Sequence, residues 1–410
     1  MVKRVAVNSL IVICSVILTL SGIELALRAF GDPDGDRHFL GYRLQPRHRI
    51  PVYHARIFLE RYRENIDNAT LVYDEALGWS YPPNANLEDG TFSTNSIGIR
   101  AQHEFTETPP ADSLRVALFG DSFVADVDVN DDEAWALQLE VKLDQAGIRA
   151  EVMNFGVSGY GMGQAYLRWQ ELGYKYSPDI VIFGLQPENL NRNVNIFRTI
   201  YQPQGPFIFS KPRFILNGQD LSVVNNPTLT PEGLIAAYRE FDSHPLAAYE
   251  FYYDSHHLVS QWWSESWLMV LLHDFLQKNV GEAEDYSPTS ERFMLGKAII
   301  DAFAAEVEAA GGSFLTIHLP LREHLRGYHE GRESPFGEFL EYVEGTYDYI
   351  PLEEYLGPEY IEQEYWGATH HYGPQINRVV ADILATEITD CIRNATCALS
   401  RFRDMSEFEH

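Results

Sequence analysis

Cysteine is scarce in this 410-residue chain: there are only three, and none forms a CxxC pair or a Cys/His cluster with zinc spacing. We therefore expect no metal, and nothing in the sequence implies an organic cofactor. Cys14 lies in an apolar N-terminal segment, which leaves Cys391 and Cys397 for the rest of the chain. An oxidising compartment permits a disulfide between these two, and two unpaired thiols are the alternative.

Basic residues are also few, with 31 Lys and Arg against 59 Asp and Glu and a formal net charge of −28. This charge argues against nucleic acid and anionic lipid surfaces as main partners. It identifies no substrate, because a solvated acidic surface explains it. Hydrophobic residues make up 45% of the chain and aromatic residues 13%, which is enough for a large globular core.

Only one long hydrophobic run is present. Val5 to Ile23 are 19 residues without a charge, preceded by Lys3 and Arg4 and closed by Glu24. Such a run is long enough to cross a bilayer as a helix, whereas a signal peptide has a shorter run and a small-x-small cleavage site. The sequence therefore predicts an uncleaved membrane anchor with its basic N-terminus inside and the remaining chain outside the cytoplasm.

The composition along the chain suggests four parts. Residues 1–30 form the anchor, and residues 31–110 are polar and rich in Pro, Asn and Gly, as expected of a stalk and lead-in subdomain with short strands and turns. Residues 111–390 form the main domain, with an insertion at about 192–292, and residues 391–410 form a C-terminal tail.

The main domain alternates apolar runs with helical patterns. The runs lack polar alternation, as strands buried on both faces of a parallel sheet do; they cover residues 115–119, 150–156, 179–185 and 312–319. Helical patterns cover residues 133–146, with Asp131 or Asp132 as N-cap, 162–174 and 296–310. The fold class that follows is α/β: a three-layer α/β/α sandwich with a mostly parallel, flavodoxin-like sheet.

The insertion contains a segment dense in aromatic residues, Ala247 to Phe275, with roughly helical spacing. A helical cap packed on the sheet is the first interpretation. A substrate groove or a membrane-facing surface is the alternative. Stacking on sugars would use rings such as Trp262, Trp263 and Trp267, although a place in the core explains them equally well.

Four segments place polar or glycine residues where buried strands end or a helix begins. Gly120-Asp121-Ser122 ends the first strand, and the glycine-rich segment 154–163 ends the second. Asn189 follows the third strand, and His371 precedes a helix. The carboxyl ends of strands in such a sheet open into a shared site.

In their order, these blocks resemble the SGNH/GDSL hydrolase family, named for Ser, Gly, Asn and His in four blocks, over about residues 116–384. The anchor ending in "GIELALRAFG", together with "YDEALGWSYPPN" and "NSIGIR", is similar to membrane-anchored bacterial members. The resemblance implies a single-pass protein of the bacterial inner membrane with a periplasmic catalytic domain.

The resemblance also implies a role for one residue of each block. Ser122 is the nucleophile and His371 the general base, while the backbone N–H groups of Ser122 and Gly159 and the side-chain amide of Asn189 form the oxyanion hole. Chemistry supports this allocation, because a serine hydroxyl is weak until an imidazole takes its proton, and an oxyanion needs donors that are fixed in advance.

Other residues compete for these roles. Ser122 is also a candidate helix cap, Gly156 a candidate oxyanion donor, and His370 a candidate base. Asn189 is also a candidate turn residue, with Asn191 or Asn193 as the donor in its place.

Two positions depart from the family pattern. Where the family has aspartate three residues before the histidine this chain has Ala368, and where it has aspartate after the asparagine this chain has Leu190. A backbone carbonyl or a carboxylate such as Glu362 or Glu364 then orients the imidazole, or the site is slow or inactive.

The acidic run after the nucleophile, "ADVDVNDDEAW", places Asp126, Asp128 and Asn130 in the alternation of a calcium loop. Asp131 stands where such a loop needs glycine and Leu137 where it needs glutamate. The run is therefore interpreted as a solvated loop that leads into a capped helix.

These observations predict an anchored, extracytoplasmic serine esterase that forms an acyl-serine intermediate. The expected substrate is an acylated envelope glycan or lipid. An O-acyltransferase acting on a polysaccharide and an inactive scaffold that binds glycan or an envelope partner are the alternatives.

Overall fold

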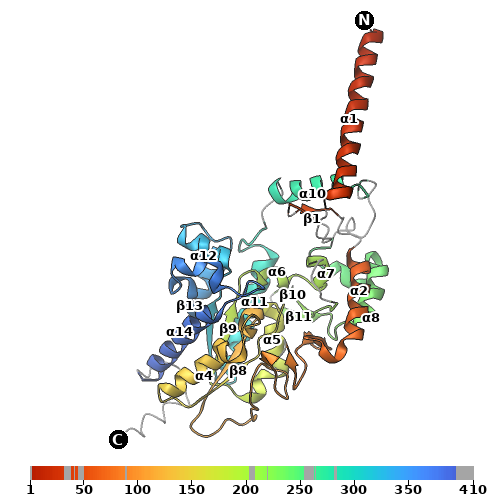
Figure 1. The fold of residues 1–410 in the computed structure, drawn as a ribbon. Coiled ribbons are helices and arrows are strands. Elements are labelled where there is room, and N and C mark those ends of the chain that lie inside the picture. The colour runs from red at the N-terminus through yellow and green to blue at the C-terminus, as the bar shows by residue number, and fades with distance from the viewer. Residues whose placement is uncertain are drawn as a thin grey trace.

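A parallel sheet of five strands lies at the centre of the computed structural model (Figure 1). The described residues are 2–31, 38–40, 42–44, 50–87, 90–202, 208–218, 220–253, 263, 265–280 and 284–393. The strands are β7 (Leu114–Phe119), β8 (Ala150–Asn154), β9 (Ile180–Leu185), β12 (Ser313–His318) and β13 (Asp348–Pro351). Their spatial order is β13-β12-β9-β7-β8, which is the flavodoxin-like order. The predicted fold class and all four predicted strands are confirmed.

Strands β7 and β9 are buried along their whole length, because both faces of the sheet are covered. Alternate side chains enter two separate cores. Leu118 and Ile182 face one core, while Phe119 and Phe183 face the other. Burial on both faces explains the continuous apolar runs of the sequence.

Helices form the outer layers. On one face lie α4 (Trp135–Gln145) and α14 (Pro374–Arg393), and on the other lie α5 (Met162–Glu171) and α11 (Glu291–Ala309). Two shorter helices, α12 (Arg322–His329) and α13 (Gly337–Glu344), lie between β12 and β13 in the chain. Helix α11 begins earlier than predicted, because the Ser290 hydroxyl accepts the N–H of Phe293 and caps it.

The start of α4 differs from the prediction. Asp131 and Asp132 lie in a 3₁₀ turn, and the cap position is Ala134. The N–H of Trp135 donates instead to the side chain of Asp126, at 2.9 Å. Asp126, nine residues before Trp135, therefore accepts the helix N-terminal N–H that was predicted to be capped by Asp131 or Asp132.

The lead-in subdomain shares the main core. It contains α2 (Ile50–Glu64), which the sequence did not predict, and the short strands β3 (Val72–Asp74), β4 (Gly78–Ser80), β5 (Asn86–Leu87) and β6 (Phe92–Ser93). Trp79 and Tyr81 are fully buried in the core that also holds the inner faces of α5 and α11. Residues between 55 and 105 are thus packed into the core of the main domain.

Helix α10 (Trp267–Val280) holds the end of the aromatic segment of the insertion. It contacts α1 (Val2–Phe30) and β2 (Tyr42–Arg43), the partner of β1 (His38–Phe39), rather than the sheet. The predicted cap on the sheet is therefore wrong for this helix, and Trp262 lies outside the described residues. The insertion also holds α7 (Arg198–Tyr201), the hairpin β10 (Arg213–Asn217) and β11 (Asp220–Val224), and α8 (Pro231–Arg239).

Helix α1 projects away from the body of the molecule (Figure 1). Within the described residues it is the one helix whose length and apolar composition fit a membrane span, over Val7–Phe30; a signal sequence near the N-terminus has the same properties. Cys14 on this helix is a free thiol. At the other end of the chain Cys391 is disulfide-bonded, and Cys397 lies outside the described residues.

Candidate active site

Ser122 is the first residue of α3 (Ser122–Ala125), a one-turn helix that follows β7 directly. The turn is fixed by Asp121, whose Oδ1 accepts the N–H of Phe123 at 2.9 Å. Because Ser122 stands at the first helical position, its own backbone N–H has no partner within the helix. This N–H is therefore free to donate toward an oxyanion.

His371 lies in the loop that leads into α14, 249 residues from Ser122 in sequence. Its Nε2 is 2.7 Å from Ser122 Oγ, and its ring packs beside Phe123 with the ring centroids 4.7 Å apart. His370 is exposed, with a φ of 67°, and its side chain makes no hydrogen bond among the described residues. The geometry thus gives Ser122 a base within hydrogen-bond reach.

The other ring nitrogen of His371 is held by Thr369. Thr369 Oγ1 lies 2.8 Å from His371 Nδ1 and 2.7 Å from Asp128 Oδ1. The hydroxyl has one proton and donates it in a hydrogen bond to the ionised carboxylate, so Thr369 Oγ1 accepts a hydrogen bond from Nδ1–H of His371. Nε2 is then left unprotonated and faces Ser122, which is the tautomer that a general base requires.

Asp128 is the acidic group of this site. Its Oδ2 lies 3.6 Å from His371 Nδ1 and accepts the backbone N–H groups of Thr369 and His371 at 2.8 and 3.1 Å. Burial raises the pKa of the Asp128 carboxyl, but hydrogen bonds from His371 and Thr369 outweigh it and hold the pKa well below its usual range. A carboxylate kept ionised here would stabilise a protonated His371 imidazole.

The position of Asp128 corrects two interpretations of the sequence. The acidic run is not a solvated loop, because Asp126 is buried and the Asp128 side chain is only 7% exposed. Glu362 and Glu364 are exposed on the surface, so neither carboxylate orients the imidazole. Within the described ranges no cluster of His, Cys, Asp and Glu fits a metal ion.

Acid is expected to remove the stability that Asp128 contributes. A lowered folded-state pKa means that the contribution is complete above the unfolded-state pKa of about 3.9 and is lost as the pH falls below it. Between about pH 5 and pH 2, the free energy of unfolding should fall more steeply for the wild type than for Asp128→Asn. Denaturant titrations of both proteins measure the two slopes, and equal slopes would contradict the contacts assigned to Asp128.

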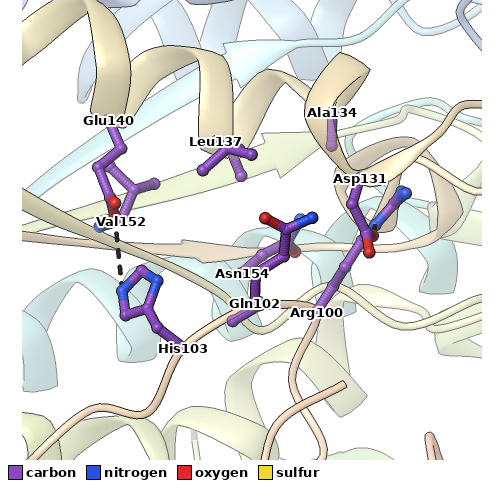
Figure 2. A pocket seen from close by; sticks show the side chains of 11 residues that line it. Arg100, Gln102, His103, Asp131, Ala134, Leu137, Glu140, Val152 and Asn154 are labelled. Carbon is purple, nitrogen blue, oxygen red and sulfur yellow. Dashed lines mark hydrogen bonds and ion pairs between the residues drawn. The ribbon is translucent and has the colours of Figure 1, made fainter. Parts of the chain in front are cut away.

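Arg100 of the lead-in subdomain fastens the loop that carries Asp128. Its guanidinium donates to the carbonyl oxygens of Ala125 and Val129, at 2.9 and 2.8 Å, and to that of Asp126. It also pairs with Asp131 at 2.9 Å. Both side chains line a small cavity of about 30 Å³, and Figure 2 shows how the residues that line it are arranged. The planar guanidinium has several N–H donors and can bind these oxygens at the same time, which the single ammonium group of a lysine would not reproduce.

A second ion pair links the remaining blocks to Asp121. Asp121 Oδ2 accepts from Asn189 Nδ2 at 3.1 Å and from Arg192 Nη1 at 2.9 Å, and both donors come from the segment that follows β9. Asn189 is the first residue of α6 (Asn189–Asn193). The amide has a second N–H, so its bond to Asp121 orients it and leaves a donor available. Arg192 also donates to the carbonyl oxygen of Tyr160 at 2.8 Å.

Gly159 lies in the same loop as Tyr160, whose carbonyl oxygen accepts from Arg192. Its φ of +78° favours glycine, and the lead-in subdomain holds the residues on both sides. Trp79 Nε1 donates to the carbonyl oxygen of Ser158 at 2.8 Å, and the Tyr160 hydroxyl donates to the carbonyl oxygen of Trp79 at 2.7 Å. At Gly156 a Cβ would lie 2.6 Å from the backbone nitrogen of Ala125, so its lack of a side chain serves close packing on α3.

Comparison with known proteins gives structural neighbours only. They include TesA (13% identity, TM-score 0.36, 67% of this chain and 99% of that one) and a putative lipolytic protein of the G-D-S-L family from Desulfitobacterium hafniense (11%, 0.32, 66% and 98%). A GDSL-like lipase from Bacteroides thetaiotaomicron is also similar (11%, 0.32, 69% and 91%). The chain is similar in structure to GDSL hydrolases.

These GDSL neighbours all have TM-scores below 0.5, so the functional argument rests on the geometry of the site. No family model and no curated protein matches the sequence.

Sequence reasoning missed Asp128, Thr369 and Arg192. The GDSL pattern directs attention to the third residue before the histidine, and Ala368 there hides the fact that Thr369 reaches a carboxylate 241 residues away. The available signal was the closeness of the acidic run to Ser122 in sequence, since Asp128 follows Ser122 by six positions.

Proposed function

We propose that this protein is a serine ester hydrolase of the SGNH type that acts through an acyl-serine intermediate. The observation that carries the proposal is the 2.7 Å contact between Ser122 Oγ and His371 Nε2, with Thr369 and Asp128 behind the imidazole. His371 takes the Ser122 proton as Oγ attacks the ester carbonyl, and returns it to the leaving alcohol. The side-chain amide of Asn189 and the backbone N–H groups of Ser122 and Gly159 donate hydrogen bonds to the oxyanion.

The link from His371 through Thr369 to Asp128 favours an active enzyme over an inactive scaffold. An SGNH-like scaffold without activity was suggested by Ala368, which removes the usual partner of the histidine. Thr369 and Asp128 supply both the hydrogen bond and the negative charge that the missing aspartate would provide.

We further propose a membrane-anchored, periplasmic location and an acylated envelope glycan or lipid as substrate. Helix α1 supports the anchor, and Lys3 and Arg4 before its uncharged run support an orientation with the main domain outside the cytoplasm. The disulfide at Cys391 fits an oxidising compartment. A substrate of the envelope would be within reach of an enzyme held there.

The test is hydrolysis of aryl esters of graded acyl length by the full-length chain in detergent, with and without an added oligosaccharide. We expect free carboxylic acid to be released in equal amount to the aryl alcohol. An acyl group found in ester linkage on the oligosaccharide would identify a transferase, because a sugar hydroxyl can attack the same acyl-serine intermediate in place of water. A folded protein that turns over no ester and transfers no acyl group would contradict the proposal.

A further inference from the structure

Helix α10 is attached to the end of α1 by a carboxylate. Glu24 of α1 accepts the backbone N–H groups of Trp267 and Leu268, at 3.0 and 2.9 Å, and the hydroxyl of Ser266 at 2.8 Å. These N–H groups belong to the first turn of α10 and have no partner within that helix. A negative charge at this position also interacts favourably with the helix dipole. Glu24 therefore acts as the N-terminal cap of a helix 243 residues away.

Arg28, one turn further along α1, adds a second connection. It pairs with Glu24 at 2.6 Å and donates to the carbonyl oxygen of Glu265 at 2.6 Å. Its guanidinium also lies over the Trp267 ring, 5.6 Å from the centroid. Two successive turns of α1 thus hold the start of α10, which runs crosswise to α1 at its foot (Figure 1).

The attachment lies at the level where α1 would leave a membrane. Val5 to Ile23 contain no charged residue, and 19 residues of helix extend about 28 Å, close to the roughly 30 Å of a bilayer core. Glu24 is the first charged residue after that length. Because Glu24 caps α10, this helix lies at the boundary between hydrocarbon and water.

One face of α10 is exposed and apolar. Met269, Leu272 and Leu276 follow one another at helical spacing and are 37%, 46% and 47% exposed. Val270 and Asp274 lie on the opposite face and are buried against the protein. A contiguous apolar strip of this kind on a protein surface marks an interaction site.

We propose that α10 is an interfacial helix whose apolar face enters the outer surface of the membrane that α1 spans. The proposal depends on the proposed membrane span of α1. Lipid is the occupant that the position of this face selects, since the start of α10 is fastened to α1 at Glu24, where the uncharged run of α1 ends. Apolar insertion needs no anionic lipid and is therefore compatible with the net charge of −28. Two attachments, α1 and α10, then fix the orientation of the ester site relative to the membrane.

The test uses an environment-sensitive thiol probe on the full-length chain in phosphatidylcholine vesicles. In a Cys14→Ala background the probe is placed at Leu272→Cys and, as a matched control, at Val141→Cys, which is 47% exposed on α4. Nitroxide groups near the top of the lipid acyl chains should quench the probe at 272 by about twofold or more and leave the probe at 141 unchanged. Adding Glu24→Ala should weaken the quenching at 272, because the cap of α10 is lost.

A probe on the native Cys14 separates this proposal from the membrane span. If the Cys14 probe is quenched by nitroxides deep in the bilayer while the probes at 272 and 141 behave alike, the interfacial helix is refuted and the span stands. If the Cys14 probe is also unquenched, both fail. Signal at 272 that depends on protein density in the vesicle rather than on the nitroxide would indicate contact between copies of the chain, and would also refute the proposal.

Discussion

Replacing Ser122 with alanine is expected to lower kcat for ester hydrolysis by about ten-thousandfold or more, because the attacking atom is removed. The matched control is Ser243→Ala, an exposed serine of the insertion whose hydroxyl, among the described residues, bonds only to the nearby Glu240 carbonyl oxygen. Both variants should unfold at the denaturant concentration of the wild type. Steady-state kinetics on an aryl acetate measure the loss.

A double variant sharpens this prediction. Residues that act as one unit lose their effects together, so Ser122→Ala with His371→Ala should be no slower than Ser122→Ala alone. Multiplied losses would show that the two residues act independently, which contradicts the 2.7 Å contact as the catalytic pair.

The second large effect is expected at Asp128. Asp128→Asn removes the charge that faces the imidazolium and should lower kcat by about a hundredfold to ten-thousandfold, with little change in KM. Asp132→Asn is the matched control, since Asp132 lies in the same acidic run and is exposed. Equal activity of the two variants would contradict the role of Asp128.

Variants of Thr369 test whether Asp128 acts on His371 through the Thr369 hydroxyl or directly as an ion pair. Thr369→Val removes the hydroxyl between His371 and Asp128 and should cost about tenfold to a hundredfold in kcat, the range of a lost hydrogen bond to a charged group. Thr369→Ser keeps the hydroxyl and should restore activity. If Thr369→Val is fully active, Asp128 acts on His371 directly across the 3.6 Å between them.

Continuous burial made the central fold predictable. Strands covered on both faces appear in the sequence as unbroken apolar runs, and β7, β9 and β12 lie within a residue or two of their predicted bounds. Strand β13 was missed because its four residues include Asp348 and Pro351 and form no such run. The serine and the histidine were recognisable because each stands where a helix begins beside a strand end.

Contacts between distant segments were not predictable. Asp128 accepts a hydrogen bond from Thr369, Arg100 donates to the loop before α4, and Glu24 caps α10. Each pair is too far apart in sequence for residue spacing to predict the contact. The lead-in subdomain illustrates the same limit. Its polar sequence suggested a stalk, yet Arg100 fastens the acidic loop and Trp79 fastens the loop with Gly159, so part of the geometry of the site originates there.

The role of Ser122 is tested most directly by the site of covalent reaction with an organic fluorophosphonate, mapped by mass spectrometry on the full-length protein. We expect a single adduct on the peptide that contains Ser122, absent from Ser122→Ala and formed far more slowly by His371→Ala. An ester-hydrolysing protein that carries the adduct on another residue, or carries none, would contradict Ser122 as the activated nucleophile.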